Sequence, residues 1–130
     1  MTDQTRKDLA ARGESIRRKV LGSKYVDAAL NNATDFSRPL QEMLNEYCWG
    51  AGWGREGGLS MRERSIIVLS ILTALGRSHE VKAHTRGALN NGMTPAEIAS
   101  VFLHAAIYAG VPAAVDSFRS AAEVIAEHGK

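Results

Sequence analysis

The stretch over residues 62–92 limits the possible folds of this chain more than any other. Residues 66–75 are almost entirely apolar, as in a buried helix, and Gly76 is a residue type at which helices commonly end. A polar helix is predicted to follow at once, and its chemically useful side chains are Arg77, Glu80, His84 and Arg86. We therefore expect a long buried helix to deliver a carboxylate, an imidazole and two guanidinium groups to one corner of the molecule.

Length and composition describe one ordinary globular domain. The chain has 130 residues, so we expect a single domain over residues 1–130. The net charge of +2 argues against nucleic-acid binding, and the one basic cluster, residues 17–19, is predicted to be a solvated helix face. Cys48 is the only cysteine, which excludes an internal disulfide, a CxxC motif and a Cys/His metal site. A polar N-terminus and the lack of a long apolar run predict a cytoplasmic protein.

Helix signals recur along the chain, and no stretch alternates with the period of a strand, so we expect an all-α fold. Ser60 with Glu63, and Thr94 with Glu97, are capping boxes, the second followed by a proline at the first helical position. The helices are predicted over residues 3–21, 26–30, 37–50, from Ser60 to Gly76, from Ser78 to Gly92, from Thr94 to about 109, and from about 112 to 127.

Two segments between these signals bear on function. Residues 49–58 are rich in glycine, contain Trp49 and Trp53, and lack the spacing of a phosphate-binding loop. The tryptophans either pack against helices or an oligomer interface, or line a small-molecule pocket. Residues 98–107 are apolar on nearly every side, so that helix needs cover, which implies self-association.

Glu80 and His84 are the strongest candidates for chemistry. They are four residues apart on one helix and can meet, and a neighbouring carboxylate raises a histidine pKa toward the range of a general acid or base. The alternative is a surface pair worth only about 0.3–0.5 kcal/mol.

His104 and Tyr108 have the same spacing on the apolar helix and need polar partners there; the alternative is a core histidine and an interface tyrosine. Arg64, Arg77 and Arg86 are candidates to bind carboxylates in bidentate fashion, although each alone is more often structural.

The chain resembles the carboxymuconolactone decarboxylase family over most of its length. The most specific elements are Leu-Gly-Arg at residues 75–77 followed by His84, and Tyr-Ala-Gly-Val-Pro at residues 108–112. The other matching pieces are residues 17–22, 34–36, 47–50 with Trp53, 64–65, Glu80, 86–88, 91–94 and 97–98.

This resemblance implies an alkyl hydroperoxidase D-like fold of about six helices that assembles as a ring-like homohexamer, a trimer of dimers. It also implies decarboxylation of 4-carboxymuconolactone to the enol-lactone of 3-oxoadipate, in protocatechuate breakdown, without a metal or other cofactor. In the hydroperoxidase members a Cys-x-x-Cys-x-x-x-His motif carries the chemistry. Those cysteines would fall on Arg77 and Glu80 here, and the relay glutamate on Ser65, which argues against thiol peroxidase activity.

On this hypothesis His84, tuned by Glu80, is the proton donor. Arg64, Arg77 and Arg86 bind the substrate carboxylates, and Trp53, His104 or Tyr108 stabilises the dienolate oxygen. Three other functions stay open: a redox protein that uses Cys48, a helical oligomer that only binds a ligand, and a decarboxylase or isomerase of a related lactone.

Overall fold

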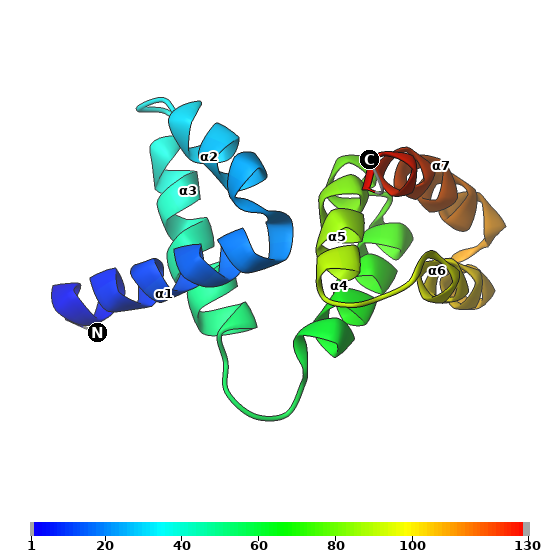
Figure 1. The fold of residues 1–130 in the computed structure, drawn as a ribbon, viewed down its shortest axis with the longest axis horizontal. Coiled ribbons are helices and arrows are strands. Elements are labelled where there is room, and N and C mark those ends of the chain that lie inside the picture. Colours follow the sequence, from blue (N-terminus) through cyan, green and yellow to red (C-terminus); the bar gives the residue numbers. More distant parts are fainter. Residues whose placement is uncertain (1, 129–130) are drawn as a thin grey trace. The chain divides into compact units, whose positions relative to one another are not determined.

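The structure of the chain, a computed structural model that describes residues 2–128, contains seven α-helices and one π-helix, and no strand, within those residues (Figure 1). The predicted all-α fold is confirmed. The helices pack as two compact units, an N-terminal unit (Met1–Gly58) and a C-terminal unit (Leu59–Lys130). That both belong to a single domain stays a prediction. Among the described residues, no helix is long and apolar enough to cross a membrane.

The N-terminal unit contains α1 (Asp3–Leu21), α2 (Ser23–Asn31), α3 (Arg38–Met43) and the π-helix η1 (Leu44–Trp53). Thr2 caps α1 by accepting a hydrogen bond from the backbone N–H of Thr5 at 3.1 Å. Gly22, with φ +92°, ends α1 as predicted and lets α2 begin at once.

The prediction of one helix over residues 37–50 and a loop from Trp49 was wrong in one respect, because the helix continues through Gly52 to Trp53 as η1. Close packing against α1 explains why glycines do not break it. A Cβ atom at Gly13 would overlap the carbonyl oxygen of Asn45, and one at Gly50 would lie 2.6 Å from the carbonyl oxygen of Leu9. The glycines therefore let two helix backbones touch.

Two further expectations for this unit were wrong. Arg17 is 4% exposed, so residues 17–19 are not simply a solvated face. The predicted apolar face of the third helix is also largely open, since Leu40, Met43 and Tyr47 are each more than half exposed. Both errors have the same cause. Helical periodicity shows which side chains share one face of a helix, but it does not show whether another element covers that face.

The C-terminal unit contains α4 (Met61–Leu75), α5 (Ser78–Asn90), α6 (Pro95–Ala109) and α7 (Val111–His128). Both predicted capping boxes are present, with Ser60 and Glu63 opening α4, and Thr94 and Glu97 opening α6. Gly76 ends α4, as the sequence predicted, and it does so in a left-handed conformation with φ +70°.

The core of this unit joins all four helices, with Leu69, Val81, Ile98 and Phe102 almost completely buried. A buried hydrogen bond of 2.8 Å between the hydroxyls of Thr73 and Ser117 ties α4 to α7. The prediction that α4 is a buried helix holds for one face only. Its other face exposes three large apolar side chains, those of Ile67, Ile71 and Leu75.

Candidate active site

Helix α5 positions the predicted proton donor and its neighbours. Arg77, rather than the predicted Ser78, occupies the N-cap position of α5, and it is exposed. Glu80 lies in the first turn and is also exposed, whereas His84 and Arg86 are half-buried. The helix therefore places one carboxylate at the surface and the imidazole one turn further along, where it is half-buried.

Burial dominates the chemistry of His84. The Nδ1 atom of its imidazole is completely buried, and desolvation lowers the pKa of His84 from 6.5 to about 4. The Glu80 carboxylate acts in the opposite direction, but its effect is smaller. Glu80 raises this pKa as expected, but the net shift is downward because burial outweighs the effect of the carboxylate. His84 is neutral near pH 7 in the free protein.

This shift predicts how stability changes with pH. Between pH 6.5 and 4 the unfolded chain binds a proton at His84 that the folded protein does not bind, so stability is highest above pH 6.5 and falls as the pH is lowered through this window. We expect a loss of about 2 kcal/mol between pH 7 and pH 5 from this residue. Denaturant unfolding of the wild type and His84→Gln at both pH values measures it; His79→Gln, at an exposed position, is the control. Equal losses in all three proteins would contradict the assignment.

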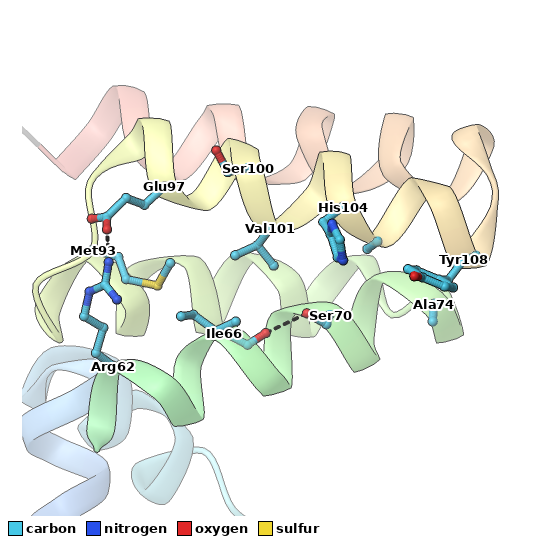
Figure 2. Close-up of a pocket in the computed structure, with 12 residues that line it drawn as sticks. Arg62, Ile66, Ser70, Ala74, Met93, Glu97, Ser100, Val101, His104 and Tyr108 are labelled. Atoms are coloured by element: carbon cyan, nitrogen blue, oxygen red, sulfur yellow. Dashed lines mark hydrogen bonds and ion pairs between the residues drawn. The ribbon is translucent and has the colours of Figure 1, made fainter. Parts of the chain in front are cut away.

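A pocket of about 670 Å³ lies between α4 and α6 within the C-terminal unit (Figure 2). Side chains one turn apart on each helix form its two walls. They are Arg62, Ile66, Ser70 and Ala74 on α4, and Glu97, Ser100, Val101, His104, Ala105, Tyr108 and Ala109 on α6, with Met93 before α6. The walls are mainly apolar; Arg62 and Glu97 lie at one end and Tyr108 toward the other, with Ser70 and His104 between them.

His104 and Tyr108 are the two predicted site residues that line this pocket. Their rings lie 5.6 Å apart, on consecutive turns of α6, and both residues are exposed. The expected alternative of a core histidine is therefore wrong. Both rings can still offer a hydrogen-bond donor to a molecule in the pocket.

Sequence reasoning missed the charged end of the pocket. Arg62 forms an ion pair there with Glu97, whose other carboxylate oxygen accepts the backbone N–H of Thr94 at 3.0 Å in the capping box (Figure 2). The carboxylate of Glu97 thus both caps the start of α6 and pairs with Arg62. The signal was present in the sequence, because a capping-box glutamate uses only one of its two oxygens for the cap.

The remaining predicted residues lie elsewhere. Arg64 is half-buried on α4 but does not line the described pocket. Trp53 is buried in the N-terminal unit, where its ring stacks on that of Trp49 with centroids 4.8 Å apart.

The structure also bears on thiol and metal chemistry. Burial raises the pKa of the Cys48 thiol above its ordinary value, and the opposite effect of Arg17 is smaller. Within residues 2–128, His, Cys, Asp and Glu side chains form no cluster of three that could hold a metal ion.

Comparison with known proteins gives three relevant similarities. The carboxymuconolactone decarboxylase family matches residues 38–123 of this chain. The chain is 43% identical over 115 residues to the nitrosuccinic acid decarboxylase npaB of Metarhizium robertsii, covering 88% of this chain and 80% of that protein. It is 38% identical over 117 residues to the 4-carboxymuconolactone decarboxylase of Acinetobacter baylyi, covering 90% of this chain and 87% of that protein.

Proposed function

This chain belongs to the carboxymuconolactone decarboxylase family and is a carboxy-lyase, and from that premise we propose that its substrate is 4-carboxymuconolactone. The product is then the enol-lactone of 3-oxoadipate, in protocatechuate breakdown in the cytoplasm. The observation that carries the proposal is the desolvated imidazole of His84, held on the helix that also carries Arg77 and Arg86. The choice of this lactone is supported by the similarity to the Acinetobacter protein.

The substrate supplies its own electron sink. When the bond to the carboxylate breaks, its electron pair moves through the ring double bond onto the lactone carbonyl oxygen, and carbon dioxide leaves. The resulting dienolate takes a proton on the carbon next to the carbonyl. This route needs no metal or organic cofactor, so the protein has only to bind two carboxylates, stabilise the dienolate oxygen and supply one proton.

His84 is assigned the proton transfer, and its lowered pKa changes how it acts. A neutral imidazole is a weak acid, so His84 has to gain a proton when the doubly charged substrate binds. A nearby anion favours the charged form of histidine, and Glu80 adds to this effect. The proton acquired on binding is the one that the dienolate takes up.

The other predicted residues keep their assigned roles within this proposal. Arg64, Arg77 and Arg86 are the candidates to bind the two carboxylates, because a guanidinium can hold a carboxylate through two parallel hydrogen bonds. The dienolate oxygen needs a hydrogen-bond donor, worth about 3–4 kcal/mol in comparable sites. His104 and Tyr108, which line the pocket of the C-terminal unit, are the candidates for that role, and the assignment of Trp53 to it stays a prediction.

Nitrosuccinic acid is the second candidate substrate, favoured by the 43% identity to the Metarhizium decarboxylase. Its chemistry follows the same scheme, since it is also a dicarboxylic acid and its nitro group accepts the electron pair as a nitronate. The two candidates therefore make the same three demands on the protein.

A parallel assay distinguishes them. We expect the purified protein, with a chelator present, to consume 4-carboxymuconolactone made in place by a cycloisomerase and to release one carbon dioxide per lactone. The kcat/KM for nitrosuccinate is expected to be at least about 10-fold lower. The opposite ranking would transfer the assignment to nitrosuccinate, and no turnover of either would contradict both.

We also propose that the protein assembles as a homohexamer, a trimer of dimers. Support comes from the open apolar face of the C-terminal unit, where Leu103, Ile107 and Tyr108 on α6 are 60, 72 and 83% exposed.

A redox function is disfavoured. The raised pKa of Cys48 keeps this residue as a thiol, and peroxide chemistry needs a thiolate.

A further inference from the structure

The guanidinium of Arg17 is a buried charge whose hydrogen-bond partners are all neutral. Arg17 lies on α1 inside the N-terminal unit and is 4% exposed. Its Nη1 atom donates to Oε1 of Gln41 at 2.9 Å and to Oδ1 of Asn45 at 3.0 Å. Its Nε atom is completely buried, and within residues 2–128 no hydrogen-bond acceptor faces it.

Among residues 2–128, no side-chain carboxylate is paired with this charge. Arg17 feels the charge of Glu14, but Glu14 is engaged by the neighbouring Arg18 in an ion pair of 3.1 Å. Burial is the main cause that lowers the pKa of Arg17 below its ordinary value, and Arg18 adds a smaller repulsion. Buried arginines in proteins are normally paired with an anion, because the cost of removing the charge from water is otherwise uncompensated.

We propose that Arg17 is the receptor for a small-molecule carboxylate, which binds along the Nε–Nη2 edge of its guanidinium. That edge presents two parallel N–H groups at the spacing of a carboxylate's oxygens. The two amides hold Nη1 and so fix the plane of the guanidinium before the ligand arrives. This preorganisation reduces the entropy lost on binding.

The local backbone is also built around this group. Asn45 lies on η1 at the point where α1 crosses it, and the side chain of Asn45 is itself buried. Long π-helical segments are rare and occur often at functional sites. A guanidinium that served only to tie α1 to η1 would be indifferent to added anions, which is the basis of the test. The inference depends on the proposed function only for the identity of the natural carboxylate.

Succinate is a suitable probe, because it is a stable dicarboxylate. We expect saturating succinate to raise the Tm of the wild-type protein by about 5 °C relative to sodium chloride of equal ionic strength. Arg17→Gln should abolish this rise. Lys19→Gln removes the same charge from an exposed position on α1 and should keep it.

Asn45→Asp tests the same point even if Arg17→Gln does not fold. The new carboxylate would lie within hydrogen-bond distance of Arg17 Nη1 and would supply the missing anion from within the chain. We expect a higher Tm without succinate and a succinate response that is largely lost. The conservative Asn45→Gln change adds no charge and should not raise the Tm.

An equal succinate response in the wild type and in folded Arg17→Gln, or a full response in Asn45→Asp, would overturn the inference, as would a wild-type Tm that succinate does not raise. Because these measurements involve no turnover, they can fail while the decarboxylase assay succeeds, and the reverse also holds.

Discussion

Replacing His84 with alanine is expected to lower kcat by about 10²- to 10⁴-fold while the protein keeps its fold and its state of assembly. The imidazole is the proposed carrier of the proton that ends the reaction, and a methyl group cannot carry it. Steady-state kinetics with 4-carboxymuconolactone measure the loss. His84 is only partly covered, so truncation leaves a small gap rather than a large cavity, and far-UV circular dichroism should be unchanged.

His79→Ala is the matched control, since it removes the same side chain from an exposed position on the same helix. We expect its kcat to stay within about 2-fold of the wild type. Near-normal turnover in His84→Ala would remove His84 from the mechanism and leave His104 or Tyr108 as the proton donor. A drop in both variants would point to a general effect on α5.

The largest loss of stability is expected from Gly13→Ala. Alanine normally favours a helix by about 1 kcal/mol over glycine. At this position the added Cβ atom would overlap the carbonyl oxygen of Asn45 and lie 2.6 Å from the backbone nitrogen of Gly50. Backbone atoms cannot turn aside as side chains do, so α1 and η1 must move apart. We expect a net loss of at least about 3 kcal/mol, measured by denaturant unfolding.

Gly52→Ala is the control for this prediction. It introduces the same methyl group into η1, where the nearest atom, the carbonyl oxygen of Tyr47, would lie 3.6 Å away, an ordinary contact. Its stability should change by less than about 1 kcal/mol. If Gly13→Ala were equally well tolerated, the close crossing of α1 and η1 could not be correct.

Helix boundaries were predictable where a local signal determines them. The capping boxes at Ser60 and Thr94 and the left-handed Gly76 are set by residues within one turn of the boundary, and each lies where the sequence indicated. The polar character of α5 was also predictable, because it follows directly from the residue types in that stretch of the chain. These features depend on backbone hydrogen bonds and steric limits that neighbouring residues alone decide.

Features that depend on distant contacts were not predictable from one sequence. The glycines after Trp49 signal a chain break, yet the backbone of α1 packs against Gly50 and the helix continues through Gly52 to Trp53. The pKa of His84 follows from burial, which the spacing of Glu80 and His84 does not reveal. The pairing of Arg62 with Glu97 likewise joins the starts of two helices that are far apart in the chain.

Helices α4 and α6 each contribute side chains to the core and to the pocket, and this arrangement affects how the protein could evolve. Leu69, Ile98 and Phe102 are buried in the core, and Ile66 and Val101 pack against it while also lining the pocket. The pocket residues His104 and Tyr108, in contrast, are exposed. Substitutions at exposed pocket positions should therefore cost little stability, whereas those at core positions should be removed by selection. A lineage could then remodel the pocket by single accepted mutations and pass through folded intermediates at every step.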